Sequence, residues 1–312
     1  MADPDAPLRL SVAQLADRLD GFVTEYLKEK SKETKGTYRR SLNEFERYHA
    51  TRAARPSSRF RFVEADVEAY KRYLMEEREL SQVSVSTYLT ALRRLCDYLV
   101  ARGDLAENPA RTVKGNRRPT AHSRGVLTEA EVERLLQEVP QTTAIGRRDR
   151  AIVSLMVFGG LSEIELTRAD IGDVDRTLMG TFIRVQGKGR QSKDESVPLD
   201  PEAVDPLEIY LLGREGSGPK APLFVSHGHR SEGTRLNTRS VRGRVNEYLR
   251  KANLKRRGIS PHSLTHTAAL IWLNAGKPVE EVRRRMRHGT LETTMISFKK
   301  QGLLKPRDGE DA

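Results

Sequence analysis

The 312-residue chain is long enough for two domains, each with its own core, at the usual roughly 100 to 200 residues per domain. With 37% hydrophobic and 31% charged residues, and no apolar run near the roughly 18 residues that a membrane span needs, the sequence excludes an integral membrane protein and a membrane partner. The 55 lysines and arginines outnumber the 43 aspartates and glutamates, so the net charge is +12. A polyanion, above all nucleic acid, is therefore the expected partner.

The cysteine content and the first residues bear on the compartment. A single cysteine, Cys96, forms no internal disulfide and no multi-cysteine metal site. The opening residues, 1–4, lack the basic and then apolar pattern of a secretion signal. We therefore expect a cytoplasmic protein. Its expected nucleic-acid partner would associate it with the nucleoid.

Residues 1–113 predict a small helical domain. From residue 10 onward, apolar residues recur at spacings of three and four, as on one face of a helix. The clearest stripe, about four turns long, consists of Val85, Tyr88, Leu89, Leu92, Leu95, Cys96 and Leu99.

Two expected helix starts in this domain combine hydroxyl groups with basic side chains. Such hydroxyls usually cap helices, and paired arginines usually lie on a solvated face, but both also suit contacts with DNA phosphates and bases. The sequence leaves the two interpretations open. The candidate DNA contacts are Lys35, Arg39, Arg40, Ser84, Thr87, Arg93 and Arg94.

Residues 114–125 predict a basic linker. The stretch from Asn108 to Val126 has no sustained apolar period and no acidic residue, but it contains Arg111, Lys114, Arg117, Arg118 and Arg124. Uncompensated positive charge favours a segment that lies along phosphates, with Arg117 and Arg118 as contacts. The alternative is a disordered, solvated connector.

Residues 126–312 predict a second, mixed domain with a short tail. Thr128 and Glu131 form a capping-box pattern, and a helix over 147–158 ends at two glycines. Strands over 181–185 and 195–199 predict a hairpin with Lys188 at its tip. Further helices are expected over 201–212, 238–252, 261–275 and 278–287. The predicted fold class is mainly α with a small β-hairpin or sheet.

Several motifs of this chain resemble those of the tyrosine recombinases, the phage integrase and Xer-type family. In family order and spacing they are GLSEIEL (160–166), VQGKG (185–189), VPL (197–199), SPHSLTH (260–266), RH (287–288) and TTMIS (293–297). The resemblance covers nearly the whole chain. It implies a two-domain clamp on duplex DNA, with a helical core-binding (SAM-like) domain and a mixed α/β catalytic-like domain.

In that family a tyrosine attacks a phosphodiester, two arginines clamp the phosphate, a hairpin lysine protonates the leaving oxygen, and histidines assist. By the resemblance, this chain keeps Lys188, His262 and His288 at their positions. Ser162 and Thr265 stand at the two arginine positions.

The nucleophile position differs as well. Ser297 stands at or next to the tyrosine position, and the last tyrosine of the chain is Tyr248, before the His262 motif. Arg168 or the arginines at 283–285 could replace the clamp only in a rearranged site. The resemblance therefore implies a catalytically inactive homologue that binds double-stranded DNA.

In the second domain, eight basic residues between 239 and 257 accompany one acid, Glu247, which favours a DNA-facing surface. The candidate contacts of this domain are Lys188, Arg190, Arg239, Arg242, Arg244 and His262. We expect no cofactor and no metal: His262 and His266 are spaced as a ligand pair, but no acid or cysteine nearby completes it. We interpret Trp272 as a core residue.

Two alternatives remain open beside a non-catalytic regulator, chromosome organiser or recombination accessory. One is a divergent recombinase with a relocated active site, in which Ser297 would be the first candidate nucleophile. The other is a scaffold that associates with itself or with an active recombinase on DNA.

Overall fold

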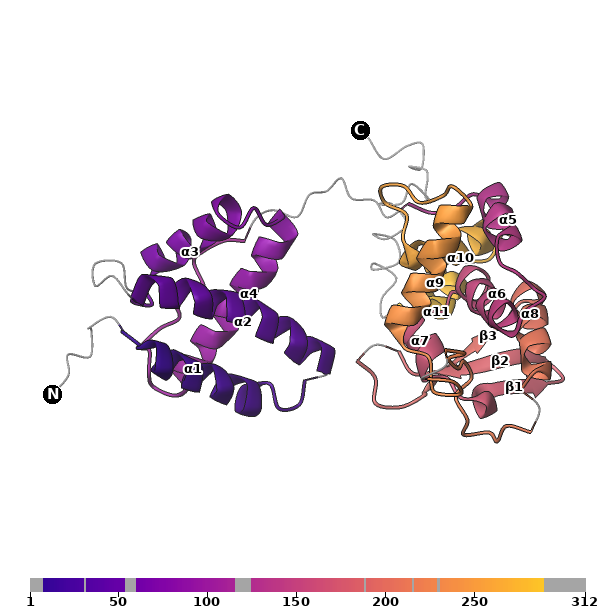
Figure 1. The fold of residues 1–312 in the computed structure, drawn as a ribbon, viewed down its shortest axis with the longest axis horizontal. Coiled ribbons are helices and arrows are strands. Elements are labelled where there is room, and N and C mark those ends of the chain that lie inside the picture. The colour runs from indigo at the N-terminus through magenta and orange to yellow at the C-terminus, as the bar shows by residue number, and fades with distance from the viewer. Residues whose placement is uncertain are drawn as a thin grey trace. The chain divides into compact units, whose positions relative to one another are not determined.

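The computed structural model describes residues 8–30, 32–53, 60–115, 125–187, 189–214, 216–228 and 231–288. The chain divides into two compact units, residues 1–120 and 121–312 (Figure 1). Each unit has a buried hydrophobic core of its own. Among the described residues no helix is both long enough and apolar enough to cross a bilayer.

The first unit is built from helices. They are α1 (Val12–Gly21), a π-helical turn (Phe22–Tyr26) that continues it, α2 (Lys32–Ala53), α3 (Glu64–Glu76) and α4 (Gln82–Ala101). The apolar stripe predicted for α4 is confirmed, because all of its members except Tyr88 are buried. Tyr88 is half-buried and packs against the same core.

In the second unit, further helices and a small sheet are arranged around a central helix. Its elements are α5 (Glu129–Gln137), α6 (Ala144–Val157), α7 (Glu163–Arg168), a 3-10 turn (Ile171–Asp173), β1 (Val174–Thr177), β2 (Gly180–Val185), β3 (Glu195–Pro198), α8 (Pro201–Leu212), α9 (Thr238–Lys251), α10 (Pro261–Asn274) and α11 (Val279–Arg285). The central helix is α6, which packs against α5, α8, α9 and α10. Residues 151–157 of α6 are all buried.

The sheet is antiparallel, in the order β1-β2-β3. Ile183 in the middle strand pairs with Val174 on one side and Val197 on the other, and these three apolar residues are buried together. The predicted hairpin of β2 and β3 is confirmed. The loop between the two strands carries Lys188, which lies outside the described residues.

Two further local predictions are confirmed. Thr128 and Glu131 form the capping box at the start of α5, since each side chain accepts the other's backbone N–H. Trp272 is buried, and its indole N–H donates to Asp200 at 3.0 Å. Gly160, after α6, has a φ of +62°, and a Cβ there would lie 2.7 Å from the Trp272 ring, so this turn requires glycine.

Two short elements have no counterpart in the sequence prediction. In β1 one residue, Val174, is buried and the other three are exposed, so the strand lacks an apolar alternation. Helix α7 has six residues, which is too short for a repeating apolar stripe.

Candidate nucleic-acid interface

The predicted contacts of the first unit differ in how far their side chains are already engaged. Ser81 caps α4 by accepting the Ser84 N–H at 3.3 Å, and the Thr87 hydroxyl donates to the Val83 carbonyl at 3.0 Å. Lys35 donates to the Lys28 carbonyl at 2.8 Å. The hydroxyl groups of Ser81 and Thr87 therefore bind the backbone of α4, which is one of the two roles that the sequence allows for such groups. DNA contacts of Lys35, Ser84 and Thr87 stay predictions.

The two neighbouring arginines of α4, Arg93 and Arg94, make different contacts. Arg93 donates from Nε to the Ala110 carbonyl at 2.9 Å and from Nη2 to the Val113 carbonyl at 2.8 Å. Arg93 thus fastens the end of this unit to α4. Arg94 is 54% exposed and has a long ion pair of 3.5 Å with Asp97. Arg94 is the better placed of the two for a partner, and Arg39 and Arg40 of α2 are exposed as well.

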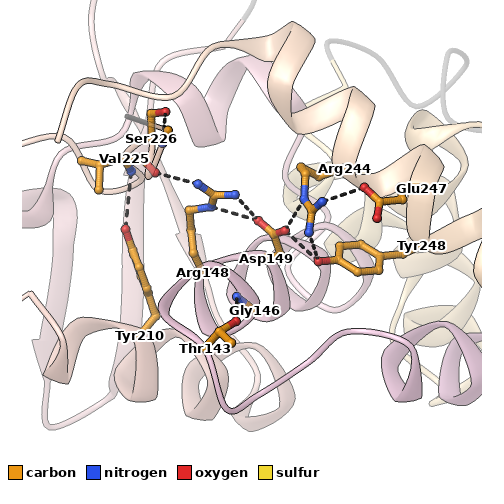
Figure 2. Close-up of polar contacts among 11 residues, drawn as sticks. Thr143, Gly146, Arg148, Asp149, Tyr210, Val225, Ser226, Arg244, Glu247 and Tyr248 are labelled. Carbon is orange, nitrogen blue, oxygen red and sulfur yellow. Dashed lines mark hydrogen bonds and ion pairs between the residues drawn. The ribbon is translucent and has the colours of Figure 1, made fainter. Parts of the chain in front are cut away.

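In the second unit, helix α9 carries three of the predicted contacts. Arg239 is exposed. Arg242 is 60% exposed, and its Nε lies 3.1 Å from a carboxylate oxygen of Glu163 at the start of α7. Arg244 instead turns toward the interior and joins a buried network of charged groups (Figure 2).

The centre of this network is the Asp149 carboxylate on α6, which is 1% exposed. Arg148 donates to Oδ1 from Nε at 2.9 Å and from Nη2 at 2.7 Å. The other oxygen, Oδ2, accepts from Arg244 Nε at 2.7 Å and from the Tyr248 hydroxyl at 2.8 Å. Arg244 also donates to Glu247 at 2.6 Å. Two cations, Arg148 and Arg244, therefore share one buried carboxylate. The contacts that the structure shows for Arg244 stabilise the fold, and a DNA contact of Arg244 stays a prediction.

The network reaches a third part of the unit through the other arm of Arg148. Its Nη1 donates to the Val225 carbonyl at 2.9 Å, and the Val225 N–H lies 3.4 Å from the Tyr210 hydroxyl on α8 (Figure 2). Burial, followed by the charge of Asp149, raises the pKa of Tyr248 to about 12. The phenol therefore remains a donor at neutral pH, and the network holds α6, α9 and the segment at Val225 together.

The motif residues Ser162 and Thr265 meet at one turn between α6 and α7. The Ser162 N–H and hydroxyl both donate to Oε2 of Glu165 at 2.7 Å. The Thr265 hydroxyl of α10, 4% exposed, donates to the Leu161 carbonyl at 3.2 Å. The structure thus brings these two positions together, as the resemblance implies, and both hydroxyl groups are satisfied within the chain. We call residues 160–165, together with the side chains that contact them, the motif pocket.

An arginine that the sequence analysis did not select as a site residue enters the motif pocket. Arg287, which follows α11, contacts Glu165 through Nε at 2.6 Å and Nη2 at 2.8 Å, and Nη2 also donates to the Gly160 carbonyl at 2.7 Å. The two side chains are 10% and 5% exposed. Its position directly before His288 in a family motif was the available signal.

The histidines of the motifs lie on α10 and directly after Arg287. The rings of His262 and His266 on α10 are perpendicular, with centroids 4.7 Å apart. Burial lowers the pKa of His288, and the adjacent Arg287 and Arg283 lower it further, so the neutral imidazole is favoured. Among the described residues no group of three or more His, Cys, Asp or Glu side chains could hold a metal ion.

The hairpin between β2 and β3 is tied to α7 at its base. Arg168 donates from Nη1 to the Gly187 carbonyl at 2.8 Å, and Arg190 pairs with Asp194 and Glu195, each at 2.8 Å. In this structure the Arg168 guanidinium thus binds the backbone of the hairpin loop. Four predicted site residues lie outside the described residues: Arg117, Arg118, Lys188 and Ser297.

Comparison with known proteins identifies the class of this fold and site. The phage integrase family model matches residues 125–301, and the phage integrase SAM-like domain matches residues 14–115. The chain belongs to the phage integrase family of tyrosine recombinases. It is 32% identical over 258 residues to the tyrosine recombinase XerC of Myxococcus xanthus, with 73% of this chain and 82% of the relative covered. XerC of Vibrio vulnificus (strain YJ016) is 36% identical over 215 residues, which cover 68% and 65%.

Solved structures share the fold at lower identity. The XerH site-specific recombinase bound to palindromic difH substrate, a post-cleavage complex, matches with a TM-score of 0.70 and 20% identity over 92% of this chain and 80% of that chain. A lambda integrase(75-356) dimer bound to a COC' core site matches with a TM-score of 0.68 and 15% identity over 89% and 96%. The predicted fold class, mainly helical with a small sheet in two domains, is confirmed.

Proposed function

We propose that this protein binds duplex DNA on a recombinase scaffold without cutting it. The observation that carries the proposal is the motif pocket. By the family resemblance, Ser162 and Thr265 stand where two arginines would clamp a phosphate. Their hydroxyl groups instead donate hydrogen bonds to Glu165 and to the Leu161 carbonyl. Among the described residues, Arg242 and Arg287 contact residues 160–165, and each is already paired with an acid, Arg242 with Glu163 and Arg287 with Glu165. No tyrosine follows Tyr248 in the sequence.

The chemistry of strand transfer explains why this set of residues argues against catalysis. Charge builds on the phosphate oxygens in the transition state, and loss of one preorganised donor costs about 10²- to 10³-fold in rate. Loss of two such donors therefore costs roughly 6 kcal/mol. A serine nucleophile at position 297 would need to be activated, and the two arginines that the family has at positions 162 and 265 are not present to contribute.

DNA as the partner is supported from three sides. The net charge is +12. Arg94, Arg239 and Arg242 keep exposed guanidinium groups on helices of both units. The structural relatives include recombinases in complexes with their DNA sites. We propose a site-specific protein of the cytoplasm and nucleoid that serves as a regulator, a chromosome-organising factor or an accessory to recombination, alone, self-associated or beside an active recombinase.

Binding is tested by fluorescence anisotropy with a labelled random-sequence duplex from low to physiological salt. We expect log K to fall linearly with log salt, with a slope of about −0.9 for each phosphate contact. Affinity that does not change with salt would refute the electrostatic interface. Mapping of the protein on the chromosome then distinguishes a site-specific protein, which gives a sharp motif, from one that coats DNA.

The alternative function, a divergent recombinase with a relocated site, makes a different prediction. Incubation with supercoiled plasmid, followed by a denaturing gel, would show relaxed DNA or a covalent product. The proposed function predicts neither.

A further inference from the structure

The Arg287 guanidinium is almost fully occupied by acceptors of its own chain. Nε and Nη2 bind both oxygens of Glu165, Nη2 also binds the Gly160 carbonyl, and Nη1 donates to the Arg285 carbonyl. A guanidinium has five N–H groups, so little donor capacity remains. A parallel pair of N–H···O bonds is also the geometry in which arginine binds a phosphate.

The Glu165 carboxylate is equally committed. Besides Arg287 it accepts the N–H and the hydroxyl of Ser162, and its side chain is 5% exposed. If Arg287 left it for a phosphate, a buried carboxylate would lose its counter-charge while a second anion approached, and both changes are strongly unfavourable. Exchange of Glu165 for a DNA phosphate is therefore opposed by the structure.

The backbone at Arg287 belongs to the end of α11. Its φ is +57°, in the left-handed region that non-glycine residues rarely adopt. The Arg287 N–H donates to the Arg284 carbonyl and the His288 N–H to the Arg283 carbonyl, which is the Schellman pattern of a helix end, so the cap accounts for this conformation. From this position, three hydrogen bonds and one ion pair hold the guanidinium.

We propose that Arg287 and Glu165 form an internal plug, in which the Glu165 carboxylate takes the place of a DNA phosphate and keeps the motif pocket from contacting the backbone. The inference rests on the proposed DNA binding. The proposed function rests on catalytic residues that the chain lacks. This inference adds that a pair of residues that is present, Arg287 and Glu165, also keeps the motif pocket from binding a phosphate.

The test measures duplex affinity and its salt dependence for three variants beside the natural protein. Glu165→Gln should release the Arg287 guanidinium to a phosphate, with about tenfold tighter binding at physiological salt and a salt slope steeper by about 0.9. The double variant Glu165→Gln, Arg287→Met removes both charges and should return affinity and slope to those of the natural protein.

Glu208→Gln is the matched control, because it removes the same charge from another ion pair of the second unit. Its partner Arg176 is 51% exposed and is not among the candidate DNA contacts, so little change is expected. An equal gain from Glu208→Gln and Glu165→Gln would show a general effect of negative charge and overturn the plug. No gain from folded Glu165→Gln would overturn it as well.

The double variant decides the question if Glu165→Gln does not fold, as thermal melting would show. A salt slope flatter by about 0.9 in the double variant would mean that Arg287 binds a phosphate in the natural protein, and the plug would be wrong. If the natural protein binds no duplex at any salt, the proposed function itself fails, which is a distinct outcome.

Discussion

Replacement of Asp149 by alanine should destabilise the second unit more than any exposed substitution in it. The carboxylate is 1% exposed and accepts four hydrogen bonds, two from Arg148, one from Arg244 and one from Tyr248. Without it, Arg148 remains 6% exposed with the Val225 carbonyl as its other acceptor. Loss of one partner from a buried pair costs about 3–5 kcal/mol. Arg244, 34% exposed, can turn toward water, so its share is smaller.

This loss is large compared with the roughly 5–15 kcal/mol by which domains are stable. For a unit of this size it corresponds to a melting temperature lower by about 10 °C. The measurement is urea unfolding followed by tryptophan fluorescence, because the chain has one tryptophan, Trp272, which is buried in the second unit. The signal therefore reports this unit alone.

Arg176→Ala supplies the matched control. Arg176 pairs with Glu208 at 2.8 Å, but the two side chains are 51% and 39% exposed, and such pairs contribute about 0–1 kcal/mol. If Asp149→Ala and Arg176→Ala shifted the unfolding midpoint equally, the buried network would not hold α6, α9 and the Val225 segment together, and our reasoning would be refuted.

Two further predictions follow from contacts of single residues. Arg93→Ala should lower the stability of the first unit by about 1.5–3 kcal/mol, because two charged hydrogen bonds to the Ala110 and Val113 carbonyls are lost. Arg94→Ala should change stability by no more than about 0.5 kcal/mol and should weaken duplex binding in anisotropy. A larger loss of stability from Arg94→Ala than from Arg93→Ala would contradict these assignments. The pKa of Tyr248 is raised from 10.0 to about 12, so the folded state keeps a proton that the unfolded state releases, and stability should be lost as pH rises from 10 toward 12. Tyr248→Phe should flatten this loss in the Trp272 signal, and an unchanged pH profile would contradict it.

The sequence predicts those features that repeat or that match a motif. The stripe on α4 and the capping box at Thr128 are local patterns, and the structure confirms them. The motifs also place Ser162 and Thr265 at one turn, although these positions are far apart in the chain. Helix α7 and strand β1 were missed because neither is long enough, or apolar enough, to show a period.

The pairs that organise the site could not be predicted, because charge pairing across the fold leaves no local pattern. Arg287 and Glu165 are separated by 122 positions, and Arg244 and Asp149 by 95. Arg244 was predicted as a DNA contact because it lies in a basic stretch. The available sign was an acid, Asp149, in an otherwise apolar and basic helix, where a buried charge requires a counter-charge from elsewhere.

The central claim, DNA binding without strand cleavage, is tested most directly by a suicide duplex that carries a nick near the bound site. A nick of this kind traps any covalent protein–DNA intermediate, which a denaturing gel then separates from the free strand. We expect no covalent product from the natural protein, and none from Ser297→Tyr, because by the family resemblance Ser162 and Thr265 replace the two arginines that would clamp the phosphate. A covalent adduct of the natural protein would contradict the account, and the attached residue would identify the relocated nucleophile.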